Sequence, residues 1–191
     1  MIESIPVTMF RGLRFTTPKE HTTLDKVLEQ ISSDKWKDRV LKCHANLKSK
    51  DWLPAFTPTG TFSHRSLKGL DSYNGIICLD LDNTADQFGV SPEELKETCK
   101  ELSWIHAAFI TPSGKGLKVI VKTNASRETY KVTEELVADM FFIATDVARG
   151  NHCKDIDRIQ FISYDPALYY NPDSDIIEHA EIELEIFSEP K

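Results

Sequence analysis

The segment Ile76-Ile77-Cys78-Leu79-Asp80-Leu81-Asp82 decides the fold of this chain and suggests its chemistry. Its apolar run is typical of a buried β-strand, and the run ends in two aspartates separated by one residue. Successive side chains of a strand alternate between faces, so Asp80 and Asp82 are expected to point to the same side. Two carboxylates at one strand end can hold a divalent cation. Aspartates also mark the end of many strands without further function, so other segments must decide between a cation site and a plain strand end.

The segments that follow predict alternating helices and strands. Ser91, Pro92 and Glu94 form a capping box with proline at the first helical position, so a helix begins there. Further strands are expected at 104–110, 116–122 and 158–163, and a long helix at 127–148. Five apolar residues recur at helical spacing along that helix and are expected to form its buried face: Val132, Leu136, Met140, Ile143 and Val147.

This order, βαββαβ, predicts an α+β fold of the ferredoxin-like or RRM-like kind with an antiparallel sheet. The first and third strands should be neighbours, with the second beside the third and the fourth beside the first. Asp80 and Asp82 should then lie beside residues 113–118 and 155–158. The sheet face opposite the helices is expected to be open and to carry six polar side chains: Asp80, Asp82, Lys118, Lys122, Arg158 and Gln160.

The remaining segments are expected to complete a single domain of 191 residues. Residues 1–70 form an α/β extension ahead of a core at 71–175, and residues 176–191 form an acidic tail. The elements expected in the extension are a strand, two helices and a turn-rich loop, at 5–11, 23–31, 34–47 and 53–62.

Composition and charge exclude several classes of protein. The net charge of −7 argues against a nonspecific nucleic-acid coat protein, although a local basic site remains compatible with it. No apolar run is long enough to span a membrane, and the N-terminus lacks signal-peptide features. The four cysteines form no CxxC pair, so zinc and disulfides are disfavoured and a reducing, cytoplasmic location is expected: Cys43, Cys78, Cys99 and Cys153.

The loop Ser113-Gly114-Lys115-Gly116 is the second candidate for chemistry. Glycines let the backbone approach a phosphate closely, and a lysine can bind it. The spacing differs from a Walker loop, and a strand rather than a helix follows. Alone, such a loop is most often a hairpin turn. Opposite a carboxylate pair, phosphate binding becomes the better hypothesis.

Three segments carry a family resemblance: Asp80-Leu81-Asp82, residues 111–118, and Asp155 with Arg158. In order and spacing they resemble the three motifs of archaeo-eukaryotic-type primase-polymerases. With the segments at 53–62, 73–75 and 158–172, the chain more closely resembles the BT4734-like/VirE N-terminal domain family, over roughly residues 40 to 175. Members of that family often precede helicase-like domains in bacterial and phage-derived proteins.

The resemblance implies a palm-like fold that binds nucleoside triphosphates and single-stranded DNA or a primer–template, in replication or a mobile element. It implies that Asp80 and Asp82 ligate Mg²⁺ or Mn²⁺, with Asp155 as the third carboxylate and Asp157, Asp146 and Asp165 as alternatives. The residues implied to meet phosphate are Ser113, Gly114, Lys115, Gly116, Lys118 and Arg158. Lys118 lies near the position where primases usually have a histidine. A lysine can bind phosphate as a point charge but does not reproduce the geometry of an imidazole ring.

Two other functions fit parts of the pattern. Residues 77–84 also match the DxDxT start of haloacid-dehalogenase-like phosphatases, in which Asp80 would be the nucleophile and Asp82 the general acid/base. A strand directly after Thr111 disfavours that class. A non-catalytic palm that binds nucleic acid through Lys118, Lys122 and Arg158 is the other alternative, and salt would weaken its binding steeply.

Overall fold

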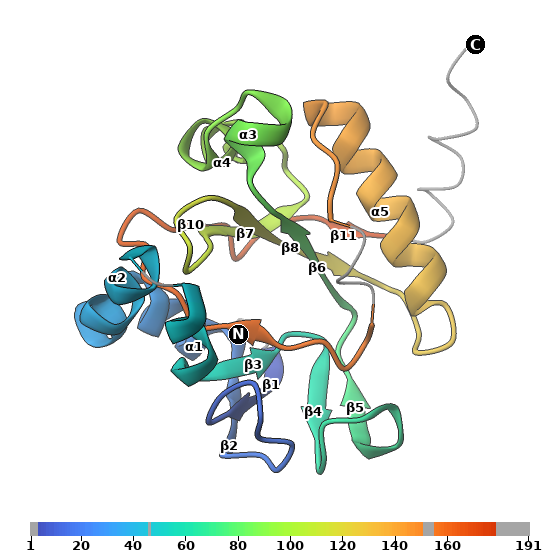
Figure 1. Ribbon diagram of the computed structural model, residues 1–191. Coiled ribbons are helices and arrows are strands. Elements are labelled where there is room, and N and C mark those ends of the chain that lie inside the picture. Colours follow the sequence, from blue (N-terminus) through green and yellow to red (C-terminus); the bar gives the residue numbers. More distant parts are fainter. Residues whose placement is uncertain (1–3, 46, 151–154, 179–191) are drawn as a thin grey trace.

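The computed structural model describes residues 4–45, 47–150 and 155–178 (Figure 1). Its elements form an α+β fold with antiparallel sheets, as the sequence predicts. Three helices lie on one side of a central sheet: α3 (Thr84–Phe88), α4 (Pro92–Lys100) and α5 (Tyr130–Thr145). The N-terminal part of the chain lies on the other side (Figure 1).

The central sheet is built around β8 (Leu117–Thr123), which β6 (Ile76–Leu81) and β7 (Ile105–Ile110) flank in antiparallel pairing. These segments are rich in the β-branched and apolar residues that favour buried strands. Two short strands extend the sheet: β10 (Tyr169–Tyr170) pairs with β7, and β11 (Ile176–Ile177) runs parallel to the end of β8. The predicted neighbours of the first three core strands are therefore confirmed.

The fourth predicted strand lies in a different sheet. Residues 158–163 contribute β9 (Gln160–Phe161), which pairs with β3 rather than flanking β6, so this part of the prediction is wrong. The order of the second sheet is β2 (Glu20–Thr23), β1 (Pro6–Phe10), β3 (Ala55–Thr57) and β9. Apolar packing explains the pairing, because Ile159 and Phe161 contact the cluster of Phe10, Ala55 and Phe62.

The rest of the N-terminal part surrounds this second sheet. Helices α1 (Leu24–Ser32) and α2 (Lys37–Ala45) are accompanied by three 3₁₀ helices, η1 (Asp34–Trp36), η2 (Leu47–Trp52) and η3 (Leu67–Gly69). A hairpin of β4 (Gly60–Phe62) and β5 (Leu70–Tyr73) leads into β6. Helix α1 buries one apolar face at helical spacing: Leu24, Val27, Leu28 and Ile31.

Both faces of the central sheet are covered, so the expectation of an open face is wrong. Ile77, Leu79 and Val119 face the cluster that includes Val137 and Phe141 of α5. On the opposite face, apolar side chains of the central sheet pack against the N-terminal part: Ile76, Cys78, Ala107, Phe109 and Ile120 against Val7, Leu24, Val27 and Ile31. Of the polar residues expected on this face, Asp80 and Lys118 are buried under the N-terminal part, whereas Asp82 is exposed.

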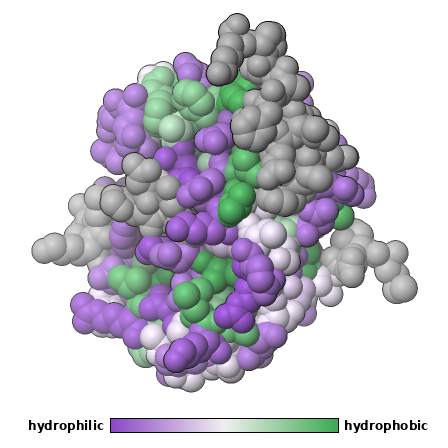
Figure 2. Space-filling model, turned by 90° about the vertical axis from the view of Figure 1, so that its right-hand side faces the viewer, coloured by the Kyte–Doolittle hydropathy of each residue, from purple (hydrophilic) through white to green (hydrophobic). Residues whose placement is uncertain are grey.

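The predicted start of α4 is confirmed, whereas the predicted buried face of α5 is wrong. The capping box of Ser91 and Glu94 is present at α4. Helix α5, however, does not bury the predicted stripe, because Val132 and Ile143 are about half exposed. Its buried face is made of Tyr130, Thr133, Glu134, Val137, Ala138 and Phe141. Figure 2 shows the side of the molecule on which α5 lies, where apolar patches interrupt a largely polar surface.

Other expectations concern single residues. Cys43, Cys78 and Cys99 are buried, whereas Cys153 and residues 179–191 lie outside the described residues. Within the described residues, no helix has the length and apolar character needed to cross a bilayer.

Candidate phosphate-binding site

Asp80 and Asp82 lie at the end of β6 but in different environments. Asp80 is opposite Lys118 in the pairing of β6 with β8, and the two side chains form an ion pair. Asp80 is 8% exposed and Lys118 is 6% exposed, because the N-terminal layer covers this face. Asp82 follows the last residue of the strand and is exposed. The structure therefore combines one buried, charge-paired carboxylate with one carboxylate at the surface.

The loop at 113–116 is the tight turn between β7 and β8. The Gly116 carbonyl accepts from the Thr111 amide at 2.9 Å, and the Thr111 carbonyl accepts from the Gly114 amide at 2.9 Å. The Ser113 hydroxyl lies 3.0 Å from the Thr111 hydroxyl and accepts from the Lys115 amide at 3.3 Å. Gly114 has φ of 72°, a conformation that favours glycine. Two turn amides are thus used internally, and the exposed Lys115 side chain is left at the surface.

The turn packs directly on the end of β6. The Thr84 amide donates to the Lys115 carbonyl at 3.1 Å. A side chain at Gly116 would clash with the Leu81 carbonyl oxygen, so glycine is needed for this close approach. The predicted convergence of the carboxylate pair and residues 113–116 is confirmed.

A third segment, residues 149–150, also lies at this end of β6, and the sequence did not indicate it. The Gly150 amide donates to the Asp80 carbonyl at 2.9 Å. A side chain at Gly150 would begin 3.6 Å from that carbonyl oxygen and 3.7 Å from Asp82 Oδ2. The preceding Arg149 pairs with the fully buried Glu134 of α5 at 2.7 Å, which anchors this segment.

Helix α2 also contributes to the site. His44 lies against the turn, with Nε2 3.1 Å from the position that a Cβ on Gly114 would occupy. The sequence did not connect His44 with this turn, because α2 lies far from the motifs along the chain and meets the turn only through the packing of the N-terminal layer.

Asp155 and Arg158 make their contacts elsewhere. They pair with each other at 3.0 Å, with side chains 67% and 41% exposed respectively. Burial raises the pKa of Tyr130 at the start of α5, and the charge of Asp155 adds to this shift. Burial lowers the pKa of Arg65, and the charge of Arg158 lowers it further. The charges of Asp155 and Arg158 therefore act on Tyr130 and Arg65, and the two side chains form their ion pair with each other.

The alternative third carboxylates occupy three different settings. Asp165 is 3% exposed and binds Lys96 of α4 at 2.7 Å, and it also accepts from the Ile110 amide at 2.9 Å. The charge of Asp157 acts on Arg65 and partly opposes the lowering of the Arg65 pKa by burial. Asp146 caps the C-terminus of α5 in the left-handed conformation. The geometry of Asp165 is that of a structural ion pair joining α4 to the end of β7.

The residues as arranged do not fit a divalent cation held by Asp80 and Asp82. The Lys118 ammonium already neutralises Asp80, and a second positive charge at that carboxylate would be repelled. In the described part of the chain, no three His, Cys, Asp or Glu side chains cluster as metal ligands. Asp80 could ligate a metal only after Lys118 had moved away.

The phosphatase interpretation is excluded by strand direction. In that class the DxDxT strand belongs to a parallel sheet flanked by helices. Here β6 runs antiparallel to β8, and β7 also runs antiparallel to β8. The turn after Thr111 is a hairpin connection, as its sequence suggests.

The fold and this edge define an α+β domain whose antiparallel sheet presents a carboxylate pair beside a glycine- and lysine-containing turn. The model of the BT4734-like, N-terminal domain family matches residues 48–170, and the chain belongs to this family. No curated protein and no solved structure matches the chain. The match spans the DxD segment, the turn and β9, whereas β1, β2, α1 and α2 precede it.

Proposed function

We propose that this chain is a primase-polymerase-like domain that binds the phosphate groups of nucleotides and single-stranded DNA. The binding edge consists of the turn at 113–116 and the segment Asp80-Leu81-Asp82. The observation that carries the proposal is the hydrogen bond from the Thr84 amide to the Lys115 carbonyl, which holds the turn on the strand end. This contact fixes the backbone of Lys115 while its side chain stays exposed to a ligand.

Lys115 and Ser113 are the residues assigned to phosphate. A lysine ammonium binds phosphate as a point charge, and a serine hydroxyl can donate to a phosphate oxygen. The two glycines have structural roles, since Gly114 supplies the left-handed turn and Gly116 permits the approach to Leu81. Lys118 holds Asp80, and this pairing removes a buried negative charge that would oppose an approaching phosphate.

Metal-dependent nucleotidyl transfer is the second candidate function. The family match covers all three motifs, and the carboxylates lie next to the proposed phosphate site. This function requires Lys118 to release Asp80, so binding without catalysis fits the described geometry better.

Binding of a fluorescein-labelled single-stranded DNA, followed by fluorescence anisotropy without divalent cations, tests the proposal. Lys115→Met should weaken binding about threefold to tenfold and reduce the salt dependence by roughly the 0.7 slope units of one phosphate contact. Lys131→Met, at an exposed position on α5, is the matched control and should bind as the native chain does. Equal affinities for all three proteins would refute the assignment of Lys115.

Asp82→Asn separates the two candidate functions. If the edge binds phosphate without metal, removal of this exposed negative charge should tighten DNA binding about two- to fivefold. If the edge is a metal-dependent transferase, the same change should abolish Mn²⁺-dependent primer synthesis from nucleoside triphosphates. Product from the native chain that is lost in Asp82→Asn would favour transfer over binding alone.

A further inference from the structure

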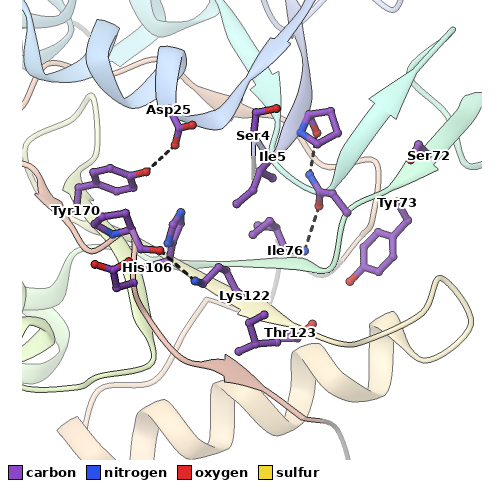
Figure 3. A pocket seen from close by; sticks show the side chains of 15 residues that line it. Ser4, Ile5, Asp25, Ser72, Tyr73, Ile76, His106, Lys122, Thr123 and Tyr170 are labelled. Carbon is purple, nitrogen blue, oxygen red and sulfur yellow. Dashed lines mark hydrogen bonds between the residues drawn. The ribbon is translucent and has the colours of Figure 1, made fainter. Parts of the chain in front are cut away.

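A pocket of about 560 Å³ opens at the other end of the central sheet (Figure 3). Lys118 and Lys122 are four residues apart on β8, so about 13 Å of strand separates this pocket from the Asp80–Lys118 pair. Four of the polar residues that line it come from four different elements: Asp25 of α1, His106 of β7, Lys122 of β8 and Tyr170 of β10. A pocket of this volume suits a small organic ligand.

His106 is the residue of this pocket that indicates a ligand. It is 2% exposed, and Nδ1 lies 2.9 Å from the Asn171 carbonyl oxygen and 3.1 Å from the Ser174 hydroxyl. A carbonyl oxygen can only accept, so Nδ1 carries the proton and Nε2 of the neutral ring is an acceptor. Within the residues that the structure describes, Nε2 has no hydrogen-bond partner. Buried polar atoms are nearly always satisfied, so a donor from a ligand would complete this site.

The neutral state of His106 follows from its surroundings. Burial lowers the pKa of His106, and the nearby charge of Lys122 lowers it further. The ring also packs edge-on against Tyr170, with centroids 5.2 Å apart, which fixes its orientation.

Charged groups stand on two sides of the pocket. Lys122 Nζ donates to the Pro172 carbonyl at 3.3 Å, a weak contact that leaves donors of the ammonium available. Figure 3 shows Asp25 on the opposite side, where its carboxylate accepts from the Tyr170 hydroxyl at 2.7 Å. A ligand in this space therefore meets the Lys122 cation on one side and the Asp25 carboxylate on the opposite side, with His106 Nε2 as a second acceptor in the same pocket.

We infer that this pocket binds a small organic anion, a phosphate or carboxylate held by Lys122, whose hydrogen-bond donors bind His106 Nε2 and Asp25. The site is independent of the proposed function, because none of these residues belongs to the edge at 80–82 and 113–116. It uses residues of both the N-terminal layer and the central sheet, so an occupied pocket would also join the two layers.

Isothermal titration of the native chain, without DNA or divalent cations, tests this inference with two matched ligand pairs. Adenosine 5′-monophosphate and 4-aminobenzoate carry the anion and a donor at opposite ends. Adenosine lacks the anion, and benzoate lacks the donor. We expect at least one of the two complete ligands to bind, and its incomplete partner to bind about tenfold more weakly, the loss expected for one hydrogen bond to a charged group.

Two variants locate the binding. Lys122→Met should weaken the bound ligand about tenfold, and His106→Phe should do the same while retaining an aromatic ring against Tyr170. Lys131→Met should leave the affinity unchanged, and circular dichroism and thermal melting check that each variant is folded. The inference is overturned if neither complete ligand binds, or if a folded Lys122→Met protein binds as tightly as the native chain. Phosphate and carboxylate sources are distinguished by which pair binds.

Discussion

Lys96 and Asp165 form the best-defined buried ion pair in the described residues, and they lie 69 positions apart in the sequence. The Lys96 ammonium contacts both carboxylate oxygens, at 2.9 and 2.7 Å, and both side chains are nearly inaccessible. Asp165 also accepts from the Ile110 amide. This one carboxylate therefore joins α4, the end of β7 and the segment that follows β9.

Lys96→Met should lower the free energy of unfolding by about 3–5 kcal/mol, because it leaves the Asp165 carboxylate buried without its cation. Lys100→Met is the matched control, since Lys100 pairs with Glu97 at the surface of the same helix and should cost at most about 1 kcal/mol. Urea denaturation measures both. Similar values for the two variants would show that the Lys96–Asp165 pair adds little stability.

The protonation of His106 should make stability depend on pH. Its pKa is lowered in the folded chain by burial and then by Lys122, while the Asn171 carbonyl and Asp25 oppose the shift. The unfolded chain therefore binds the proton more readily. The stability contribution is complete above the unfolded value of about 6.5 and is lost as the pH falls through the lowered folded value.

Thermal melts between pH 7 and pH 5 measure this dependence. The melting temperature of the native chain should fall, and that of His106→Phe should fall less, because the phenyl ring does not titrate. Lys122, Asp25 and Tyr170 face His106 from neighbouring elements and remain in both proteins. His64→Gln, at an exposed position, should follow the native curve. Parallel curves for the native chain and His106→Phe would contradict this prediction.

For single residues, the sequence predicted which side chains share a face of a strand but not which of them form buried ion pairs. Strand alternation placed Asp80 and Lys118 on one side, and the pairing of β6 with β8 confirms it. The contact between Lys96 and Asp165 joins elements that local patterns do not connect. It was therefore beyond sequence reasoning, and Asp165 was considered only as a possible third carboxylate.

The turn between β7 and β8 is the element on which the proposed site depends. Gly116→Ala would bring a methyl group against the Leu81 carbonyl oxygen and should push the turn away from β6. We expect a loss of about 1–3 kcal/mol in stability, as for overpacked sites, together with weaker DNA binding. Gly150→Ala is the control at the same edge, because its Cβ would meet only ordinary contacts, at 3.6 and 3.7 Å. Chemical denaturation and the anisotropy assay measure the two effects.

A Gly116→Ala protein with native stability would show that the turn does not need this close approach. A stable Gly116→Ala protein that nevertheless bound DNA poorly would instead indicate that the variant disturbs the turn locally.

Elements with strong local signals were predicted well, and those fixed by long-range packing were not. The cap of α4 and strands β6, β7 and β8 follow from residue type and periodicity. Strand β9 has two residues, and its place is decided by the apolar cluster around Phe10 and Phe62. Helix α5 has apolar residues on several faces, so its periodicity did not identify the side that Val137 and Phe141 bury.

At the scale of the whole molecule, the N-terminal layer changes the character of the sheet. The alternation of Asp80, Lys118 and Lys122 with apolar residues looked like a solvent-exposed face. In the structure, α1, α2 and the second sheet cover most of that face, and the polar residues fall at the two ends of the covered area. One end becomes the proposed phosphate-binding edge and the other becomes the pocket of His106 and Lys122.

The central claim is that phosphate groups bind where the turn at 113–116 meets the end of β6. Titration of the ¹⁵N-labelled chain with a short single-stranded DNA, followed by two-dimensional amide NMR, tests it most directly. We expect the largest shift changes at Gly114, Lys115, Gly116 and Thr84, and small ones at His106 and Lys122 in the distant pocket. Saturable binding with its largest shifts elsewhere on the surface, or no shift at 113–116 at any DNA concentration, would contradict the claim.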